Sequence, residues 1–316
     1  MAEGDKVTTR FTWKRIHDRG EFLGLTPTGM EITTTAIVVN RVSGGKIVEE
    51  WSESTGVLEA TRQRLEQERI ERERIEQELR VARSIQQASL PKEVPSLRGW
   101  QITPYYQPAR EVGGDFYDFH LLPEGRLGVV VGDATGKGVP AALVMASARS
   151  MLRALAQASD SPGEVLGRVN DALVTDIPPN MFVTCFYAIL DPKYGTLEYA
   201  NAGHDLPYLW RGGDAHELRA TGMPLGLMPG MRYEHKETEL DRGQGVFFYG
   251  DGLVEAHDPK GEMFGFPRLR AHVAERGEER SLGEYLMEEL YSFVGKGWEQ
   301  EDDITLLTLR RSVSPS

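Results

Sequence analysis

The 316-residue sequence has little of three features that would each point to a defined class of protein. It holds one cysteine, Cys185, which lies in an apolar run, so no internal disulfide can form and a reducing compartment is expected. It has no basic excess, because 36 Lys and Arg against 48 Asp and Glu give a net charge of -12, which argues against nucleic-acid binding. It has neither an apolar run of the roughly 18 residues that span a membrane nor a signal-peptide core. These absences predict a cytoplasmic protein that binds neither nucleic acid nor membrane.

Four aspartates stand beside glycines or other acidic residues, next to strand-like apolar segments. They are Asp115 in GGDFYD, Asp133 in GDATGKG, Asp251 in YGDGLVEA and Asp302 in EDDITLL. Each one alone is typical of a turn. Gathered in one pocket they would repel one another, so together they indicate a site for divalent cations such as Mg²⁺ or Mn²⁺, which prefer hard oxygen ligands. Two such ions can activate water against a phosphate ester.

The segment GDATGKG also invites comparison with the phosphate-binding loop of nucleotide-binding proteins. That loop requires G-x-x-x-x-G-K-[ST]. Three residues separate Gly132 from Gly136, and Gly138 stands where the loop has Ser or Thr. Nucleotide binding is therefore disfavoured, and the glycines are expected to let the backbone approach a metal closely.

Changes of pattern divide the chain into three regions. Residues 1–57 alternate between apolar and polar positions and contain a Gly-Gly turn, which predicts a small β-rich segment. Residues 58–90 are expected to form a helical linker. Residues 91–316 combine many short strand-like runs with helices grouped between them, which predicts an α+β domain.

The linker is expected to be a long and mostly exposed helix. Between Arg62 and Arg80, twelve of nineteen residues are charged, and pairs such as Arg64 and Glu68 stand four apart, where helical side chains meet. Its apolar residues fit a coiled-coil seam only in places. It is either a solvated spacer or a parallel dimeric coiled coil that transmits a signal, and a marginal seam suits a switch.

The third region contains two consecutive helical segments. The first follows GDATGKG and is rich in Ala, Leu and Met, so we expect it to be mostly core. In the second, Ser161, Pro162 and Glu164 match a capping box at a helix start. Both helices are expected to lie on one face of a sheet.

From about Gln86 to Arg311, motifs in order resemble the PPM family of metal-dependent serine/threonine phosphatases, specifically the bacterial SpoIIE and RsbU subgroup. They are SIQQASLPKEVP, YYQPAREVGGDFYDF, VVVGDATGKGVPAALVMA, FVTCFYAILD, YANAGHDLPYL, GMPLGL, YGDGLVEA and EDDITLLTLR. The resemblance implies a four-layer αββα sandwich, preceded by a long helix and a β-rich segment, with two Mn²⁺ or Mg²⁺ ions at one end.

The resemblance also implies a role for each acidic residue of the site. Asp133 matches the carboxylate that bridges both metals, and the carbonyl of Ala134 is a further ligand. Asp115 would hold the second metal, and Asp251 and Asp302 the first. Asp133 and Asp115 are thereby the expected catalytic carboxylates of a phosphoric monoester hydrolase.

Four further residues are expected around the metal ligands. Asp303 stands where many relatives have Asn, and Asp118 either orients water or is a strand-end acid. His204 is either a loop histidine or a group near the phosphate, and Asn201 is similarly placed. Asp205 departs from the Asn expected after that histidine, which alters substrate contact.

The resemblance extends to partners and control. In relatives the substrate is a phosphorylated anti-sigma-factor antagonist, a STAS-domain protein. Helical linkers precede the phosphatase domain in this family, and this similarity favours a homodimer through residues 58–90. An alternative is a pseudophosphatase that acts as a dimeric scaffold or ligand sensor; it would be expected to lack a metal carboxylate, and none is missing.

The segment GEFLGLTPTGMEITTTAIVVNRVSGGKIVEEW resembles the C-terminal half of SnoaL-like polyketide (ester) cyclases. Only about the last 50 residues of such a domain are present, so an independent cyclase is not expected and no catalytic residue carries over. The segment is either a truncated domain or a pairing surface, and it is also a candidate ligand-binding module that gates the phosphatase.

Overall fold

The computed structural model of the protein describes residues 2–16, 29, 31–54, 56–159, 161–277 and 282–313. The chain forms two compact units, Met1–Glu78 and Leu79–Ser316. Within the resemblance to cyclases, residues 20–28 and 30 lie outside the described residues.

The first unit contains a four-stranded antiparallel sheet with the order β1-β2-β3-β4. The hairpin between its last two strands turns through Gly44 and Gly45, as the Gly-Gly pair predicts, and their φ angles of 59° and 79° suit a type I′ turn. The strands are β1 (Ala2–Glu3), β2 (Lys6–Ile16), β3 (Glu31–Ser43) and β4 (Lys46–Ser54).

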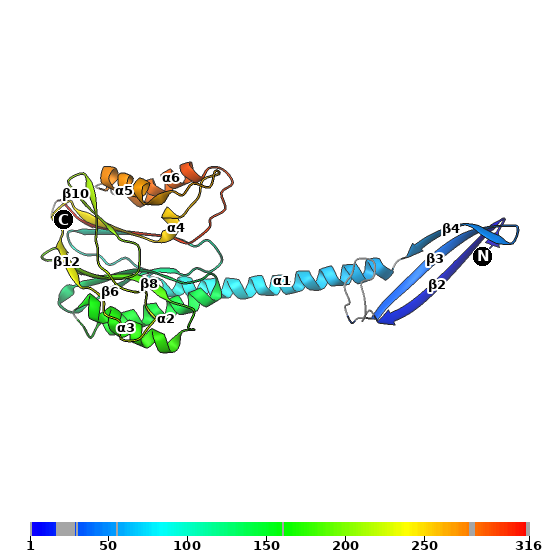
Figure 1. Ribbon diagram of the computed structural model, residues 1–316, viewed down its shortest axis with the longest axis horizontal. Helices are drawn as coiled ribbons and strands as arrows, with labels where there is room; N and C mark the ends of the chain where they lie inside the picture. The colour runs from blue at the N-terminus through cyan, green and yellow to red at the C-terminus, as the bar shows by residue number, and fades with distance from the viewer. Residues whose placement is uncertain are drawn as a thin grey trace. The chain divides into compact units, whose positions relative to one another are not determined.

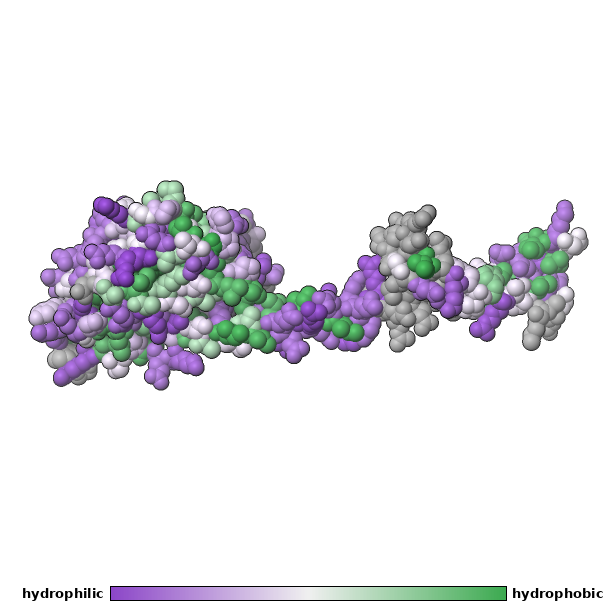
Figure 2. Space-filling model, turned by 90° about the horizontal axis from the view of Figure 1, so that it is seen from below, coloured by the Kyte–Doolittle hydropathy of each residue, from purple (hydrophilic) through white to green (hydrophobic). Residues whose placement is uncertain are grey.

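Helix α1 spans Gly56–Ser89, where the sequence predicts a helix over 58–90. Its surface is largely hydrophilic, with hydrophobic residues at intervals (Figure 2). Ion pairs one turn apart follow the helix, and because their side chains are about half exposed each adds little to stability. The pairs are Arg64–Glu68, Arg69–Glu73 and Arg74–Glu78. Ile70, Ile75, Val81 and Ile85 remain exposed.

The second unit is a sandwich of two five-stranded antiparallel sheets, with α2 and α3 outside one sheet and α5 and α6 outside the other (Figure 1). The first sheet has the order β12-β9-β8-β7-β6 and contains β6 (Asp115–Leu121), β7 (Leu127–Ala134), β8 (Val183–Asp191), β9 (Thr196–Ala202) and β12 (Lys236–Glu239). The second has the order β11-β10-β13-β14-β5 and contains β5 (Trp100–Gln107), β10 (Tyr208–Arg211), β11 (Asp214–Glu217), β13 (Gly245–Tyr249) and β14 (Ile304–Arg311). The expected αββα layering is confirmed.

The helices of this unit are α2 (Val139–Ala156), α3 (Pro162–Asp176), α4 (Asp251–Val254), α5 (Gly265–Arg276) and α6 (Leu282–Val294), with a 3₁₀ turn, η1, over Pro123–Gly125. Among the described helices, α2 alone is long and apolar enough to cross a membrane by composition. One side of α2, however, packs into the core through residues such as Met145 and Leu152.

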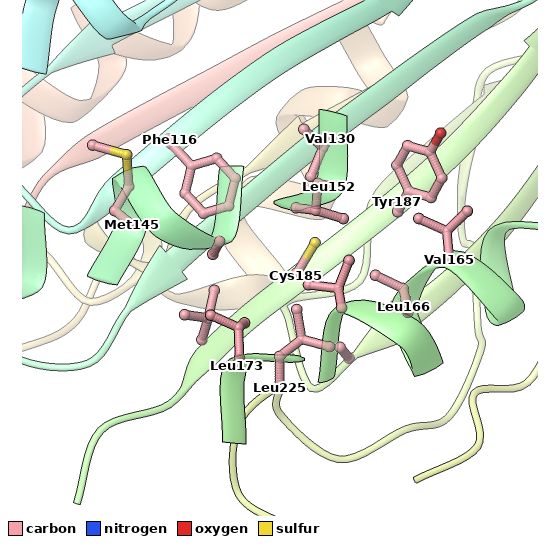
Figure 3. Close-up of a cluster of buried hydrophobic side chains, with 14 of the residues drawn as sticks. Phe116, Val130, Met145, Leu152, Val165, Leu166, Leu173, Cys185, Tyr187 and Leu225 are labelled. Atoms are coloured by element: carbon pink, nitrogen blue, oxygen red, sulfur yellow. The ribbon is translucent and has the colours of Figure 1, made fainter. Parts of the chain in front are cut away.

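Three hydrophobic layers hold the sandwich together. The layer between the sheets contains Val129, Phe186, Phe248 and Leu307. A second layer joins the first sheet to α2 and α3, and Figure 3 shows Phe116, Met145, Leu173 and Cys185 within it. Cys185 is fully buried, as its apolar surroundings predict. The third layer joins the second sheet to α5 and α6 through Trp210, Phe247, Leu269 and Leu286.

The start of α3 corrects one prediction. The helix begins at Pro162 as expected, but the capping box is wrong, because Ser161 makes no side-chain cap. The Ser161 hydroxyl lies 3.2 Å from His235 Nδ1, and Glu164 accepts a hydrogen bond from Ser159 instead. Ser161 therefore contacts a residue distant in sequence, and Glu164 contacts a residue before the helix instead of the backbone of residue 161.

Candidate metal centre

Strand pairing brings together the two aspartates that begin and end a β-hairpin. Asp115 is the first residue of β6 and is the Cα partner of Asp133 near the end of β7. Directly opposed residues of an antiparallel pair project from the same face, with Cβ atoms about 5 Å apart. The two carboxyl groups therefore share one end of the first sheet.

The other two aspartates come from the second sheet. Asp251 opens α4 directly after β13, and the preceding Gly250 donates its N–H to the carbonyl of Thr305 on β14 at 2.8 Å. Asp302 lies just before β14, so this bond holds Asp251 near it. Asp133, Asp251 and Asp302 line one cavity, so the two sheets contribute to one cluster.

Glycines permit this close approach. A Cβ on Gly114 would lie 2.5 Å from the carbonyl oxygen of Ala134 and 2.7 Å from Asp133 Oδ1. A Cβ on Gly250 would lie 2.5 Å from Asp115 Oδ2. Real side chains do not tolerate such distances, so both positions require glycine and the surrounding oxygens stay close together.

The cluster is electrostatically unfavourable without a positive partner. Burial, and then the charges of Asp133, Asp303 and Asp251, raises the pKa of Asp115 well above its ordinary value. Burial and nearby carboxylates also raise the pKa of Asp133 to about 6 and that of Asp251 to about 7. Asp115 Oδ2 is buried, and no hydrogen-bond partner for it lies among the described residues. A cation would reverse each of these shifts.

One cation already reaches the cluster. The ammonium group of Lys137 lies 2.8 Å from Asp302 Oδ2 and donates to the carbonyl of Glu301 at 2.7 Å. Within the described residues, no three His, Cys, Asp or Glu side chains are arranged as a ready set of metal ligands. The donor atoms are nevertheless all hard oxygens, and in the described part of the chain the buried Asp115 Oδ2 is left without a partner, so the residues fit Mg²⁺ or Mn²⁺.

A cavity of about 280 Å³ opens onto the aspartates. Acidic, basic and hydroxyl groups converge on it, as in sites that bind a polar substrate group. Its lining includes Asp133, Thr135, Lys137, Thr184, His204, Asp205, Asp251 and Asp302.

His204 is held on both sides of its ring. Its Nε2 lies 3.1 Å from the carbonyl of Tyr249, so Nε2 carries the proton and donates, and Nδ1 accepts from the Thr184 hydroxyl at 3.0 Å. Burial lowers the pKa of His204 to about 4, so the ring is neutral. Asn201 accepts the His204 N–H and donates to its carbonyl, which fixes the loop that places the ring.

The two remaining acidic predictions lie in different places. Asp303 accepts the N–H groups of Ala109 and Asp115 at 2.9 and 3.2 Å, so it anchors the backbone that carries the first aspartate. Asp118 is fully buried and pairs with Arg149 at 3.0 Å and Arg153 at 2.6 Å. It stands three residues along β6 from Asp115, about 10 Å away, so the structure does not bring it into the cluster.

Sequence reasoning gave no role to Lys137, and it raised Asp205 only as a departure from the family pattern. Burial and the charge of Glu255 raise the pKa of Asp205 to about 6, and its buried Oδ2 finds no hydrogen-bond partner within the ranges that the structure describes. The signals were the lysine inside GDATGKG and the acid directly after His204.

Comparison with known proteins is consistent with this architecture. A family model described as Stage II sporulation protein E (SpoIIE) matches residues 123–312, and one described as SnoaL-like polyketide cyclase matches residues 1–63. The SiaA-PP2C domain of Pseudomonas aeruginosa superposes with a TM-score of 0.67 at 26% identity, over 76% of this chain and 98% of that one.

Two curated relatives extend the comparison. Protein IcfG of Synechocystis sp. is 33% identical over 264 residues, which are 74% of this chain and 42% of that protein. Phosphoserine phosphatase RsbU of Bacillus subtilis is 28% identical over 240 residues, which are 75% of this chain and 70% of that protein. The chain thus spans less than half the length of IcfG. Because the SpoIIE model covers more than half of its residues, the chain belongs to the SpoIIE family of PP2C-fold proteins.

Proposed function

We propose that the chain is a metal-dependent protein serine/threonine phosphatase. The observation that carries this proposal is the gathering of aspartates from both sheets: Asp133, Asp251 and Asp302 line one cavity, and Asp115 is buried directly beside Asp133. The pKa values of Asp115, Asp133 and Asp251 are raised, and a bound cation would lower them again. Two Mn²⁺ or Mg²⁺ ions held there would activate water for in-line attack on phosphorus and offset charge on the phosphoryl group.

Each acidic residue of the site, together with Lys137, has a separate role in this proposal. By the family resemblance, Asp133 and the Ala134 carbonyl would hold both metals, Asp115 would hold one of them, and Asp251 with Asp302 would hold the other. Lys137 supplies a positive charge at the cavity wall. Asp303 holds the backbone of the Asp115 segment in place.

We propose as substrate a phosphorylated STAS-domain protein, an anti-sigma-factor antagonist, in the cytoplasm. The similarity to RsbU, a phosphoserine phosphatase, supports a phosphoserine substrate. The cavity lies open at the edge of the sandwich and is lined by polar groups, which suits a phosphorylated side chain presented by a folded protein.

We further propose that α1 forms a parallel homodimer and controls the enzyme. Near its C-terminal end, Arg83 pairs with Glu111 at 3.1 Å and Gln86 binds the backbone of Gly113. Gly113 in turn packs closely on the Asp303 carboxyl group, which binds the Asp115 N–H. A shift of α1 would therefore reach the metal ligands through a chain of direct contacts.

The test uses the full chain, a phosphoseryl STAS-domain protein and a phosphotyrosyl peptide as substrates. Phosphate release from the serine substrate should require Mn²⁺ or Mg²⁺, stop with EDTA and greatly exceed release from tyrosine. Asp241→Asn, at an exposed turn, is the matched control for aspartate substitutions and should keep full activity. Release that is insensitive to EDTA, or a preference for phosphotyrosine, would refute the proposal.

A further inference from the structure

A second, larger cavity of about 640 Å³ lies within the unit Leu79–Ser316. Its walls are the C-terminal end of α1 with the residues that follow it, from Ala88 to Pro95, the end of β6, and the last turns of α2. None of its lining residues lines the cavity at the aspartates. Its volume falls in the range of about 300–1,000 Å³ that is usual for small-molecule sites.

The walls of this cavity are basic. Lys92, Arg149 and Arg153 line it, against the single acid Glu93 among its lining residues. Asp118, behind the wall, pairs with both arginines and neutralises one of them, so one positive charge remains in excess. Arg153 is half exposed, so its guanidinium can engage a ligand while Arg149 continues to hold Asp118.

His120 adds an unsatisfied polar group to the same wall. Its side chain is 2% exposed, it lines the cavity, and neither ring nitrogen has a hydrogen-bond partner among the described residues. Burial, which outweighs the opposing charge of Asp118, together with the charges of Arg153 and Arg149 lowers the pKa of His120 to about 4, so the ring offers one donor and one acceptor. Buried polar groups in proteins are rarely left without partners.

The neighbouring strands hold this ring in place. Gly128 stands opposite His120 on β7, and its missing side chain leaves room for Tyr187 from β8. The rings of His120 and Tyr187 meet edge to face at 6.1 Å. The polar group at the cavity is therefore positioned by packing rather than by hydrogen bonds.

We propose that this cavity binds a small organic anion. A carboxylate or phosphate group of the ligand contacts Arg153 and Lys92, and a second polar group of the ligand pairs with the ring of His120. The bound ligand would touch three segments at once, namely the residues after α1, β6, which begins with Asp115, and α2, which follows the Asp133 loop.

The experiment titrates the full chain without metal, in EDTA, so that its outcome does not depend on phosphatase activity. Inorganic phosphate and glutarate are added separately, and the ring resonances of His120 are followed by NMR, with His120→Phe as the assignment control. Phosphate, glutarate or both should shift these resonances saturably, and the pattern identifies which acid group the cavity takes.

Matched variants decide whether the ion occupies this cavity. Lys92→Gln, at an exposed position, and Arg153→Gln should each weaken binding about tenfold, the loss expected for one charge-assisted contact. Arg168→Gln, an exposed arginine on α3, should bind as the native chain does. If neither probe shifts His120 saturably, or if Lys92→Gln and Arg168→Gln bind alike, the proposal is wrong. Lys92→Gln keeps the test valid even if Arg153→Gln fails to fold.

Discussion

The side-chain amide of Gln86 pairs with the backbone of Gly113, donating to its carbonyl at 2.6 Å and accepting its N–H at 3.1 Å. Gln86 lies near the end of α1 and is buried, although most of that helix is exposed. Gly113 stands two residues before Asp115. One amide therefore joins the linker helix to the segment that carries a proposed metal ligand.

Gln86→Leu should weaken Mn²⁺ binding severalfold and lower the free energy of unfolding by about 1–3 kcal/mol, because two buried backbone groups lose their partner. Gln87→Leu, at the exposed neighbour, is the control and should change neither quantity. Manganese titration and urea unfolding of the two variants provide the comparison. Identical Mn²⁺ affinities in both would show that this contact does not couple α1 to the site.

Lys137→Met should strengthen Mn²⁺ binding in the absence of substrate. The ammonium 2.8 Å from Asp302 competes with an added cation for the same carboxylate. Because both side chains are more than a third exposed, the gain should be modest, about fivefold. Lys193→Met, an exposed lysine in the turn before β9, is the control. Weaker Mn²⁺ binding in Lys137→Met would mean that the lysine supports the ions instead of competing with them.

Acid should destabilise the protein partly through His204. Its pKa is lowered from 6.5 to about 4, so between these values the unfolded chain binds a proton that the folded chain does not. Stability is therefore lost as pH falls from 6.5 toward 4, by up to about 3 kcal/mol from this group. The raised pKa values of the aspartates favour the folded protein as pH falls, which opposes the effect of His204. This contribution is the same in the native chain and in a His204 variant, so it cancels in their comparison.

His204→Gln should accordingly lose less stability than the native chain between pH 7 and pH 4. Urea unfolding at several pH values measures the difference, with His216→Gln, an exposed histidine, as control. Equal acid destabilisation of native protein and His204→Gln would show that the ring is not held neutral.

The sequence could predict the acidic cluster because its logic is local. Each aspartate stands beside a glycine or another acid at a strand end, and no apolar core explains such a set. The four-layer fold could be predicted because the motifs that resemble the PPM family occur in the expected order along the chain. The roles of side chains whose partners are distant in sequence could not be predicted from neighbouring residues. Asp118 forms ion pairs with Arg149 and Arg153, more than thirty residues away. The Ser161 hydroxyl forms a hydrogen bond with His235 instead of capping its own helix.

The buried residues of the long helix α1 could likewise not be predicted from the sequence. The charge pattern of α1 predicts a helix but not which of its residues becomes buried. Gln86 looks like its neighbour Gln87 in sequence, and only the packing of the following domain separates them. The cavity at His120 likewise forms between elements that no spacing rule connects.

The two-metal site is tested most directly by equilibrium Mn²⁺ binding to the native chain and to Asp133→Asn, measured together with phosphate release from a phosphoseryl protein. The native chain should bind two ions, whereas Asp133→Asn should bind fewer and lose activity by about a thousandfold, because the shared carboxylate is gone. Without metal, Asp133→Asn should be at least as stable as the native chain, since one repelling carboxylate has been removed. Undiminished Mn²⁺ binding and phosphate release in Asp133→Asn would contradict the two-metal site.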